Sequence, residues 1–252
     1  MPAGLLTTPD ASWPRGWKWG LFAAALGGGL VAFRLLAGDV FNGHVLETAV
    51  YQFQPVDLLW AIPVGLAGAM GGLFFNKMQI ILPPLTRRLN SKPVLRSLSG
   101  GVVLGGAASI FPLILFSGQH ELQPLHDSRT EVVFAFILLA GIAKFFVTSY
   151  LMTTGWKGGQ FLPIMFGGAA FGLATAMLIP SITPAVAVVG GMAGATVAVI
   201  RQPIAVVALL LFFFPPKLAG VMVIATLVGL LVARPFALPP GQLSFGGGMK
   251  GE

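Results

Sequence analysis

The sequence contains no cysteine, and it has few charged residues of either sign. A chain without cysteine has no disulfide framework and no thiolate metal site. Only 9% of its 252 residues are charged, against about 25% in ordinary soluble domains. A domain of 26.3 kDa needs more polar groups than this to cover a water-exposed surface, and a disordered chain requires low hydrophobicity. The composition therefore argues against a soluble enzyme and against intrinsic disorder.

Hydrophobic residues are abundant instead, at 56% of the chain with a mean hydropathy of +0.86. A membrane helix needs about 20 apolar residues to cross the bilayer. The later apolar segments are unequal and interrupted by Gly and Pro, a pattern typical of tilted and discontinuous helices around an ion or substrate site. No alternating strand pattern of about ten residues recurs. The sequence thus predicts an all-α polytopic membrane protein in a lipid bilayer. Its apolar segments are 19–37, 56–75, 94–116, 132–152, 161–179, 184–200, 203–214 and 218–233.

Three regions are expected along the chain. Residues 1–18 form an N-terminal tail, 19–235 the transmembrane domain, and 236–252 a flexible Gly- and Pro-rich C-terminal tail. The first region has three prolines and an early acid, unlike a cleavable signal peptide, so we expect the first apolar segment to remain in the protein.

The formal net charge of +7 marks the orientation of the chain in the membrane. The loop and helix ends at residues 76–96 carry five Lys or Arg and no acid, so they should face the cytoplasm. Residues 38–57 and 117–131 are mainly acidic and should lie outside. The cations form neither a long stripe nor a nucleic-acid-binding motif, so no nucleic acid partner is expected. We expect a multi-pass protein of the plasma (inner) membrane.

Groups that could carry out catalysis or hold a metal are scarce. The motifs of zinc proteases, serine hydrolases, P-loop enzymes and dithiol oxidoreductases are absent. His120 and His126 flank an acidic loop, which we interpret as solvated rather than as a metal site. Every acid lies outside the apolar segments or at an edge, so an intramembrane protease or proton relay lacks its carboxylates. The sequence predicts no enzyme, no cofactor and no metal.

The strongest local signal is the stretch GWKGGQFLP at residues 155–163, where a Gly-rich loop opens directly into an apolar helix. The first N–H groups of a helix have no intrahelical acceptor and lie at the positive end of its dipole. Glycines let an ion approach that backbone closely, and Pro163 in the first turn loses no helical hydrogen bond. Such an end binds an anion without holding it too tightly to leave again.

These residues also carry a family resemblance. The segment 159–163, GQFLP, resembles the G-x-F-x-P motif of the CLC chloride channels and chloride/proton exchangers. Further resemblances follow in the order of the family and extend over most of residues 18–235. They are the helix with an F-N-K turn at 58–77, a loop at 111–122, the small-residue helix at 165–172 and the segment with an I-R-x-P core at 190–211.

The resemblance implies half of a known architecture. CLC subunits have two antiparallel related halves around a chloride pathway, and they are homodimers. The match covers the second half, because the first-half motifs G-S-G-x-P and G-x-E-G-P do not occur in this chain. We therefore expect a fragment of a longer protein, or a half-length form that needs a partner half. The implied function is chloride transport, as channel or as chloride/proton exchanger. The alternatives are a secondary transporter for another small anion and a non-transporting membrane assembly subunit.

By the same resemblance, the backbone N–H groups of Gln160 and Phe161 are the expected anion ligands. Gly158 and Gly159 shape the approach, and Pro163 marks the helix start. The Phe161 ring is a gate element or plain packing.

Two lysines are candidates for the electrostatics of the pathway. Lys144 matches a basic residue that the family often carries on the preceding helix, and Lys157 would attract anions at the mouth. A plainer interpretation of Lys144 is a lysine that caps carbonyls, and of Lys157 a lysine on the surface. Arg201 is interpreted as the cap of a helix end.

Overall fold

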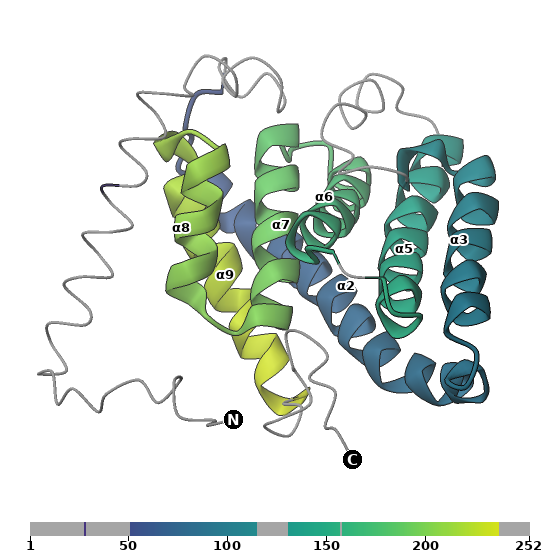
Figure 1. Cartoon of the computed structure of the whole chain (residues 1–252). Coiled ribbons are helices and arrows are strands. Elements are labelled where there is room, and N and C mark those ends of the chain that lie inside the picture. The colour runs from purple at the N-terminus through teal and green to yellow at the C-terminus, as the bar shows by residue number, and fades with distance from the viewer. Residues whose placement is uncertain (1–27, 29–50, 115–130, 157, 237–252) are drawn as a thin grey trace, which may run out of the picture. The chain divides into compact units, whose positions relative to one another are not determined.

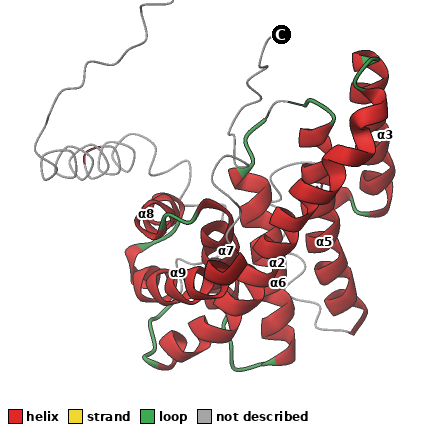
Figure 2. Cartoon of the chain, turned by 90° about the horizontal axis from the view of Figure 1, so that it is seen from below, coloured by secondary structure: helices red, strands yellow, loops and turns green. Residues whose placement is uncertain are grey.

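The computed structural model describes residues 28, 51–114, 131–156 and 158–236. The chain divides into two compact units, Met1–Phe41 and Asn42–Glu252, and every described residue except Gly28 belongs to the second. Helices make up the regular structure of this described part (Figures 1 and 2). They are α2 (Val56–Thr86), α3 (Pro93–Ile110), α5 (Glu131–Thr153), α6 (Phe161–Leu178), α7 (Pro184–Ile200), α8 (Pro203–Phe213) and α9 (Ala219–Ala233), with short 3-10 turns η2 (Arg87–Leu89), η3 (Pro112–Ile114), η4 (Pro216–Leu218) and η5 (Arg234–Phe236).

Five of the described helical stretches are long and apolar enough to cross a membrane. The helices α7 and α8, with 17 and 11 residues, are shorter than a full span. This confirms the prediction of an all-α polytopic membrane protein whose helices are of unequal length. The five stretches are Val56–Thr86, Pro93–Ile110, Phe134–Thr153, Phe161–Leu178 and Pro216–Phe236.

Helix α7 lies at the centre of the described bundle. All of its residues from Val186 to Val199 are buried, and it packs against α2, α6 and α9. Small residues make the approach close. A Cβ added to Gly172 would strike the carbonyl of Ala187, and one added to Gly194 would strike the carbonyl of Gly65. Backbones packed this closely gain van der Waals contact that larger side chains would prevent.

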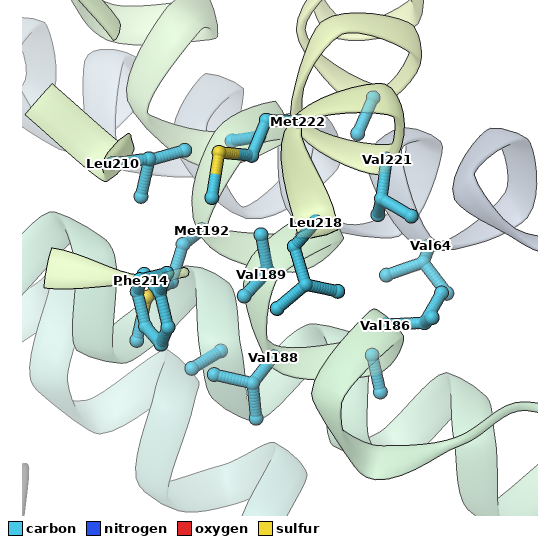
Figure 3. Packing of buried hydrophobic residues seen from close by; sticks show 14 of the residues in the cluster. Val64, Val186, Val188, Val189, Met192, Leu210, Phe214, Leu218, Val221 and Met222 are labelled. Atoms are coloured by element: carbon cyan, nitrogen blue, oxygen red, sulfur yellow. The ribbon is translucent and has the colours of Figure 1, made fainter. Parts of the chain in front are cut away.

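An aliphatic core fills the space between α7 and the last two helices. Figure 3 shows Val189 and Met192 of α7 near Leu210 of α8 and Met222 of α9, with Leu218 of η4 beside them. Lipid tails are as apolar as these side chains, so the hydrophobic effect does not drive helices together inside a membrane. Van der Waals packing of this core stabilises the helix contacts instead. At the other side of the bundle α3 packs on α5 (Figures 1 and 2).

The predicted helix boundaries agree with the structure at most ends. Prolines in the first turn begin α3, α7 and α8, where a missing N–H costs nothing. Arg201 follows α7 in a left-handed conformation with φ 60°. Its guanidinium donates 2.8 Å to the carbonyl of Phe236, which confirms its interpretation as a residue at helix ends. Apart from Gly28, the predicted span 19–37 lies outside the described residues, as do the tail residues 1–18 and 237–252.

Helix α2 corrects one predicted boundary. The sequence predicted an apolar segment that ends at Phe75, with a cytoplasmic loop and the adjoining helix ends at 76–96, yet α2 continues to Thr86. Asn76 does not interrupt it, because its side-chain amide donates 3.0 Å to the carbonyl of Ala198 on α7. A shorter difference occurs in α3, which ends at Ile110 and is followed by η3 rather than continuing to 116.

Asp57 corrects a second expectation. It was placed in an external acidic loop, but it lies in the first turn of α2 and is only 1% exposed. Its carboxylate accepts 2.6 Å from the Tyr51 hydroxyl and 3.0 Å from the Gln54 N–H. Burial, the hydrogen bond to Asp57 and its negative charge together raise the pKa of Tyr51 above its usual value. The pair therefore ties the segment before α2 to the helix start.

Candidate anion site at the start of α6

The chain turns sharply between α5 and α6. Gly155 has φ 95°, a left-handed conformation that glycine adopts without strain. Its N–H donates 3.3 Å to the carbonyl of Met152, and the N–H of Trp156 donates 3.1 Å to the carbonyl of Leu151. This pair of hydrogen bonds is the Schellman motif that ends many helices. The sequence Gly-Trp after α5 thus directs the chain back toward the bundle.

Helix α6 then begins within the glycine-rich stretch. Gln160 is its N-cap residue, and the Gln160 carbonyl accepts 3.1 Å from the N–H of Ile164. The N–H groups of Phe161 and Leu162 precede the first intrahelical donor, and Pro163 has none. A Cβ added to Gly158 or Gly159 would meet no atom within 4 Å. The helix start is therefore open to a small ligand on the glycine side.

A cavity of about 340 Å³ adjoins this helix start. One wall comes from α5 and another from the connector and the first turn of α6, while Leu104 of α3 and Ile114 of η3 complete the lining. The cavity is many times larger than the ~10–15 Å³ that one water requires. No acidic side chain occurs among its described lining residues. The remaining lining residues are Lys144, Val147, Thr148, Leu151, Met152, Trp156, Gly158, Gly159, Gln160, Leu162 and Pro163.

Lys144 is the cation among the described lining residues of this cavity. It lies within α5 and is 5% exposed. Its ammonium group donates 2.6 Å to the carbonyl of Ile114 and lies 5.5 Å from the centroid of the Phe166 ring. The hydrogen bond agrees with the plainer interpretation of Lys144 as a lysine that caps a carbonyl. Lys144 is also a lining residue of the cavity, and its contribution to the electrostatics of a pathway stays a prediction. In a surrounding of low polarity, a positive charge acts on an anion more strongly than it would in water.

The structure brings together most of the residues that the sequence singled out. Besides Lys144, the cavity wall includes Gly158, Gly159, Gln160 and Pro163. Phe161, whose backbone N–H was a predicted ligand, is not among the lining residues of the cavity, and its side chain is 44% exposed. Lys157 lies outside the described residues, as do both histidines of the acidic loop.

Sequence reasoning missed two contributions to the wall. They are Trp156, which lies close in sequence to the predicted glycines, and Thr148 of α5. The position of Trp156 within the glycine-rich stretch 155–163 was a signal that could have identified it as a lining residue. Nothing comparable marks Thr148, because it reaches the cavity only through its position one helical turn after Lys144. Among the described residues no group of three potential metal ligands comes together.

Comparison with known proteins places this arrangement in a family. The model of the family described as "Voltage gated chloride channel" matches residues 10–234. The chain belongs to the voltage gated chloride channel family. Its membership accounts for the ordered set of motifs from the F-N-K segment to the I-R-x-P core, and it agrees with the several apolar helices of a multi-pass integral membrane protein.

Curated members of the voltage gated chloride channel family are similar to the chain over most of its length. The H(+)/Cl(-) exchange transporter ClcA of Salmonella agona (strain SL483) is 26% identical over 184 residues, which cover 68% of this chain and 39% of the transporter. ClcA of Cronobacter sakazakii has the same identity and coverage. YfeO, a protein named for ion transport in Escherichia coli (strain SE11), is 30% identical over 188 residues, or 72% of this chain and 42% of YfeO. The chain thus spans about two fifths of the curated relatives that it matches.

Proposed function

We propose that this chain takes part in the transport of chloride, or of a similar small anion, across a membrane. The observation that carries the proposal is the cavity at the start of α6, whose described lining includes two unobstructed glycines, the N-cap residue of a helix whose first N–H groups lack intrahelical acceptors, and the buried Lys144. Such a wall attracts an anion through dipoles and one charge. Membership in the voltage gated chloride channel family supports chloride over other anions.

The ion would approach the backbone N–H groups of Gln160 and Phe161 past Gly158 and Gly159. Transport requires that the ion be bound well enough to enter and weakly enough to leave. Lys144 already donates to the carbonyl of Ile114, so part of its charge is compensated. Because its ammonium group is also engaged by this carbonyl, Lys144 would attract the anion without forming a tight ion pair with it.

Several partners belong to this proposal. The chain covers 39% of the ClcA transporter that it matches, and a pathway between two halves needs the first half of the fold to complete its wall. We propose that this first half, supplied by the same or by another chain, packs against the described helices, and that the complete unit forms a homodimer in the plasma membrane. Channel activity and proton-coupled exchange are both compatible with the site, since the carrier of a proton would belong to the first half.

Anion flux from liposomes tests the proposal. The protein is isolated from its native membrane and reconstituted with chloride inside and an impermeant anion outside. Gly159→Leu should abolish most of the chloride flux, because the added side chain projects into the open approach to the site. Gly105→Leu is the matched control, since Gly105 on α3 also has no atom within 4 Å of an added Cβ and lies outside the cavity wall. Equal flux in both variants would contradict the proposed site, and absence of flux from the unmodified protein would favour a non-transporting assembly subunit.

A further inference from the structure

Long-range hydrogen bonds connect the first two turns of α3 to the turn that leads into the anion site. The Nε and Nη2 atoms of Arg96 both donate to the carbonyl of Thr153, with Nε at 3.0 Å. The indole Nε1 of Trp156 donates 3.0 Å to the carbonyl of Ser97. Arg96 and Ser97, neighbours on α3, are thus bonded to Thr153 before Gly155 and to Trp156 after it. The partners are 57 and 59 positions apart in the sequence.

Arg96 completes the end of α5 from outside that helix. Thr153 is the last residue of α5, and the final carbonyls of a helix lack intrahelical donors. A guanidinium at this end also interacts favourably with the negative pole of the helix dipole. The Nη1 atom of Arg96 donates 3.2 Å to the side-chain oxygen of Asn90, which fixes the orientation of the planar group. Arg96 is therefore held from both sides.

Trp156 joins the same contact to the cavity. It is a lining residue of the cavity, while its indole N–H is engaged by α3. The fit is close, since a Cβ added to Gly100 would lie 2.9 Å from the Trp156 Nε1 and nearer still to the Thr154 hydroxyl. The hydrogen bond and the contact with Gly100 restrict the orientation of the indole, although the side chain is 44% exposed.

We propose that Arg96 and Trp156 are positioning residues of the anion site. They hold the turn at Gly155 so that Gly158, Gly159 and Gln160 present the start of α6 to the cavity. This inference rests on the proposed function. A binding constellation on a connector is precise only where neighbouring residues lock it, and displacements of about 1 Å in such supports change ligand interactions measurably. Neither residue needs to touch the anion to have this effect.

A purely structural role would look different. Many apolar side chains of α3 are exposed and do not pack on the bundle, among them Val94, Leu98, Val102 and Ile110. The hydrogen bonds of Arg96 and Trp156 therefore also help to attach α3 to the bundle. If attachment were their only role, loss of these hydrogen bonds would lower the thermal stability of the protein and leave the half-saturating anion concentration of the flux unchanged. Positioning predicts a change in the half-saturating anion concentration.

The test uses the protein isolated from its native membrane, with the variants Trp156→Phe and Arg96→Gln. Trp156→Phe removes the N–H donor and keeps an aromatic ring. Arg87→Gln is the control for the lost charge, because Arg87 is exposed on η2. Chloride flux is measured over a range of chloride concentrations, and amide hydrogen exchange is measured for residues 155–162.

Both test variants should raise the half-saturating chloride concentration about threefold to tenfold, with less than a twofold change in the maximal flux. They should also accelerate exchange at 155–162 about tenfold. Arg96→Lys should restore part of the affinity, since one ammonium can still donate to the Thr153 carbonyl. Arg87→Gln should change none of these quantities.

Two failures are distinguishable. If the unmodified protein shows no saturable chloride flux, the proposed function is wrong, whatever the exchange data show. If it does show saturable flux, but Arg96→Gln and Trp156→Phe leave the half-saturating concentration at the value of Arg87→Gln, the positioning role is overturned while the proposed function stands. A fall in thermal stability alone would likewise assign the contacts to attachment of α3.

Discussion

The ammonium group of Lys144 donates a 2.6 Å hydrogen bond to the carbonyl oxygen of Ile114, and both residues line the cavity at the start of α6. The bond fixes a positive charge at one wall while the helix start provides donors at another. The same nitrogen thus donates the hydrogen bond that stabilises η3 and provides the positive charge of the proposed site, so the stability of η3 and the electrostatics of the site are coupled.

Replacing Lys144 should separate these two contributions. Lys144→Met keeps most of the side-chain volume but removes the charge, so the half-saturating chloride concentration should rise about tenfold, equivalent to ~1.4 kcal/mol. It also leaves the Ile114 carbonyl without this donor, which should cost about 1–3 kcal/mol of folding free energy. Flux titration and thermal unfolding measure the two effects. Lys144→Arg, which retains a charge and donors, should preserve most of the affinity; equal affinity in Lys144→Met and the unmodified protein would contradict the electrostatic role.

The approach past the glycines should respond to side-chain size in a graded way. A Cβ at Gly159 meets nothing within 4 Å, so Gly159→Ala should fold normally and reduce chloride flux by less than about threefold. Gly159→Val and larger substitutions should reduce it progressively, since each added group extends further into the open space. Flux assays with melting curves on the same samples check this. A loss of flux that follows the melting temperature instead of side-chain volume would count against obstruction.

The glycines of the helix interface should behave in the opposite way. A Cβ on Gly191 would strike the carbonyl of Gly168, and overpacking of this kind costs typically ~1–3 kcal/mol. Gly191→Ala should therefore lower the unfolding midpoint. Gly106→Ala on α3 is the control, because its Cβ meets no atom within 4 Å and alanine favours a helix interior over glycine by up to ~1 kcal/mol. Thermal unfolding in detergent should show opposite signs for the two variants, and a shared sign would argue against the close packing of α6 and α7.

The Tyr51–Asp57 pair predicts a pH dependence of stability. The pKa of Tyr51 is raised in the folded protein, above the value of about 10 for an unperturbed tyrosine. A raised pKa means that the folded state binds the phenol proton more tightly than the unfolded state. The resulting stabilisation is fully present below pH ~10 and is lost as the pH rises through the folded-state value. Tyr51→Phe should therefore be less stable than the unmodified protein by a constant amount at neutral pH, and this difference should shrink above pH ~10.

Phenolate absorbance provides a direct check of that pair. In a Tyr150→Phe background Tyr51 is the remaining tyrosine, so its ionisation can be followed alone while the protein is folded. It should begin to ionise only above pH ~10. Ionisation at the ordinary value for tyrosine would show that the hydroxyl does not donate to a buried Asp57 carboxylate.

Much of the fold follows from local sequence. Prolines at 184 and 203 mark helix starts because their ring and missing N–H suit a first turn, and long apolar runs define the membrane helices. The end of α2 was not predictable in this way. The apolar run stops near Phe75, but helical hydrogen bonds continue through polar residues, and Asn76 is accommodated by a carbonyl 122 positions away.

The same division applies to the site. Glycines followed by a helix start predicted where an anion would meet the backbone, because that property belongs to consecutive residues. The roles of Trp156 and Arg96 depend on partners in another helix, and the burial of Asp57 depends on Tyr51 before the helix. Neither type of contact leaves a periodic signal in one sequence, since it is created when the helices pack.

The central claim is that a small anion binds between the start of α6 and Lys144. Anomalous diffraction from crystals of the protein grown or soaked in bromide tests it most directly, because bromide replaces chloride and its position is seen without assuming a transport mechanism. The account predicts an anomalous peak within hydrogen-bonding distance of the backbone N–H groups of Gln160 and Phe161, and its loss in Gly159→Leu crystals. Bromide bound elsewhere in the protein, with this cavity free of it, would contradict the account.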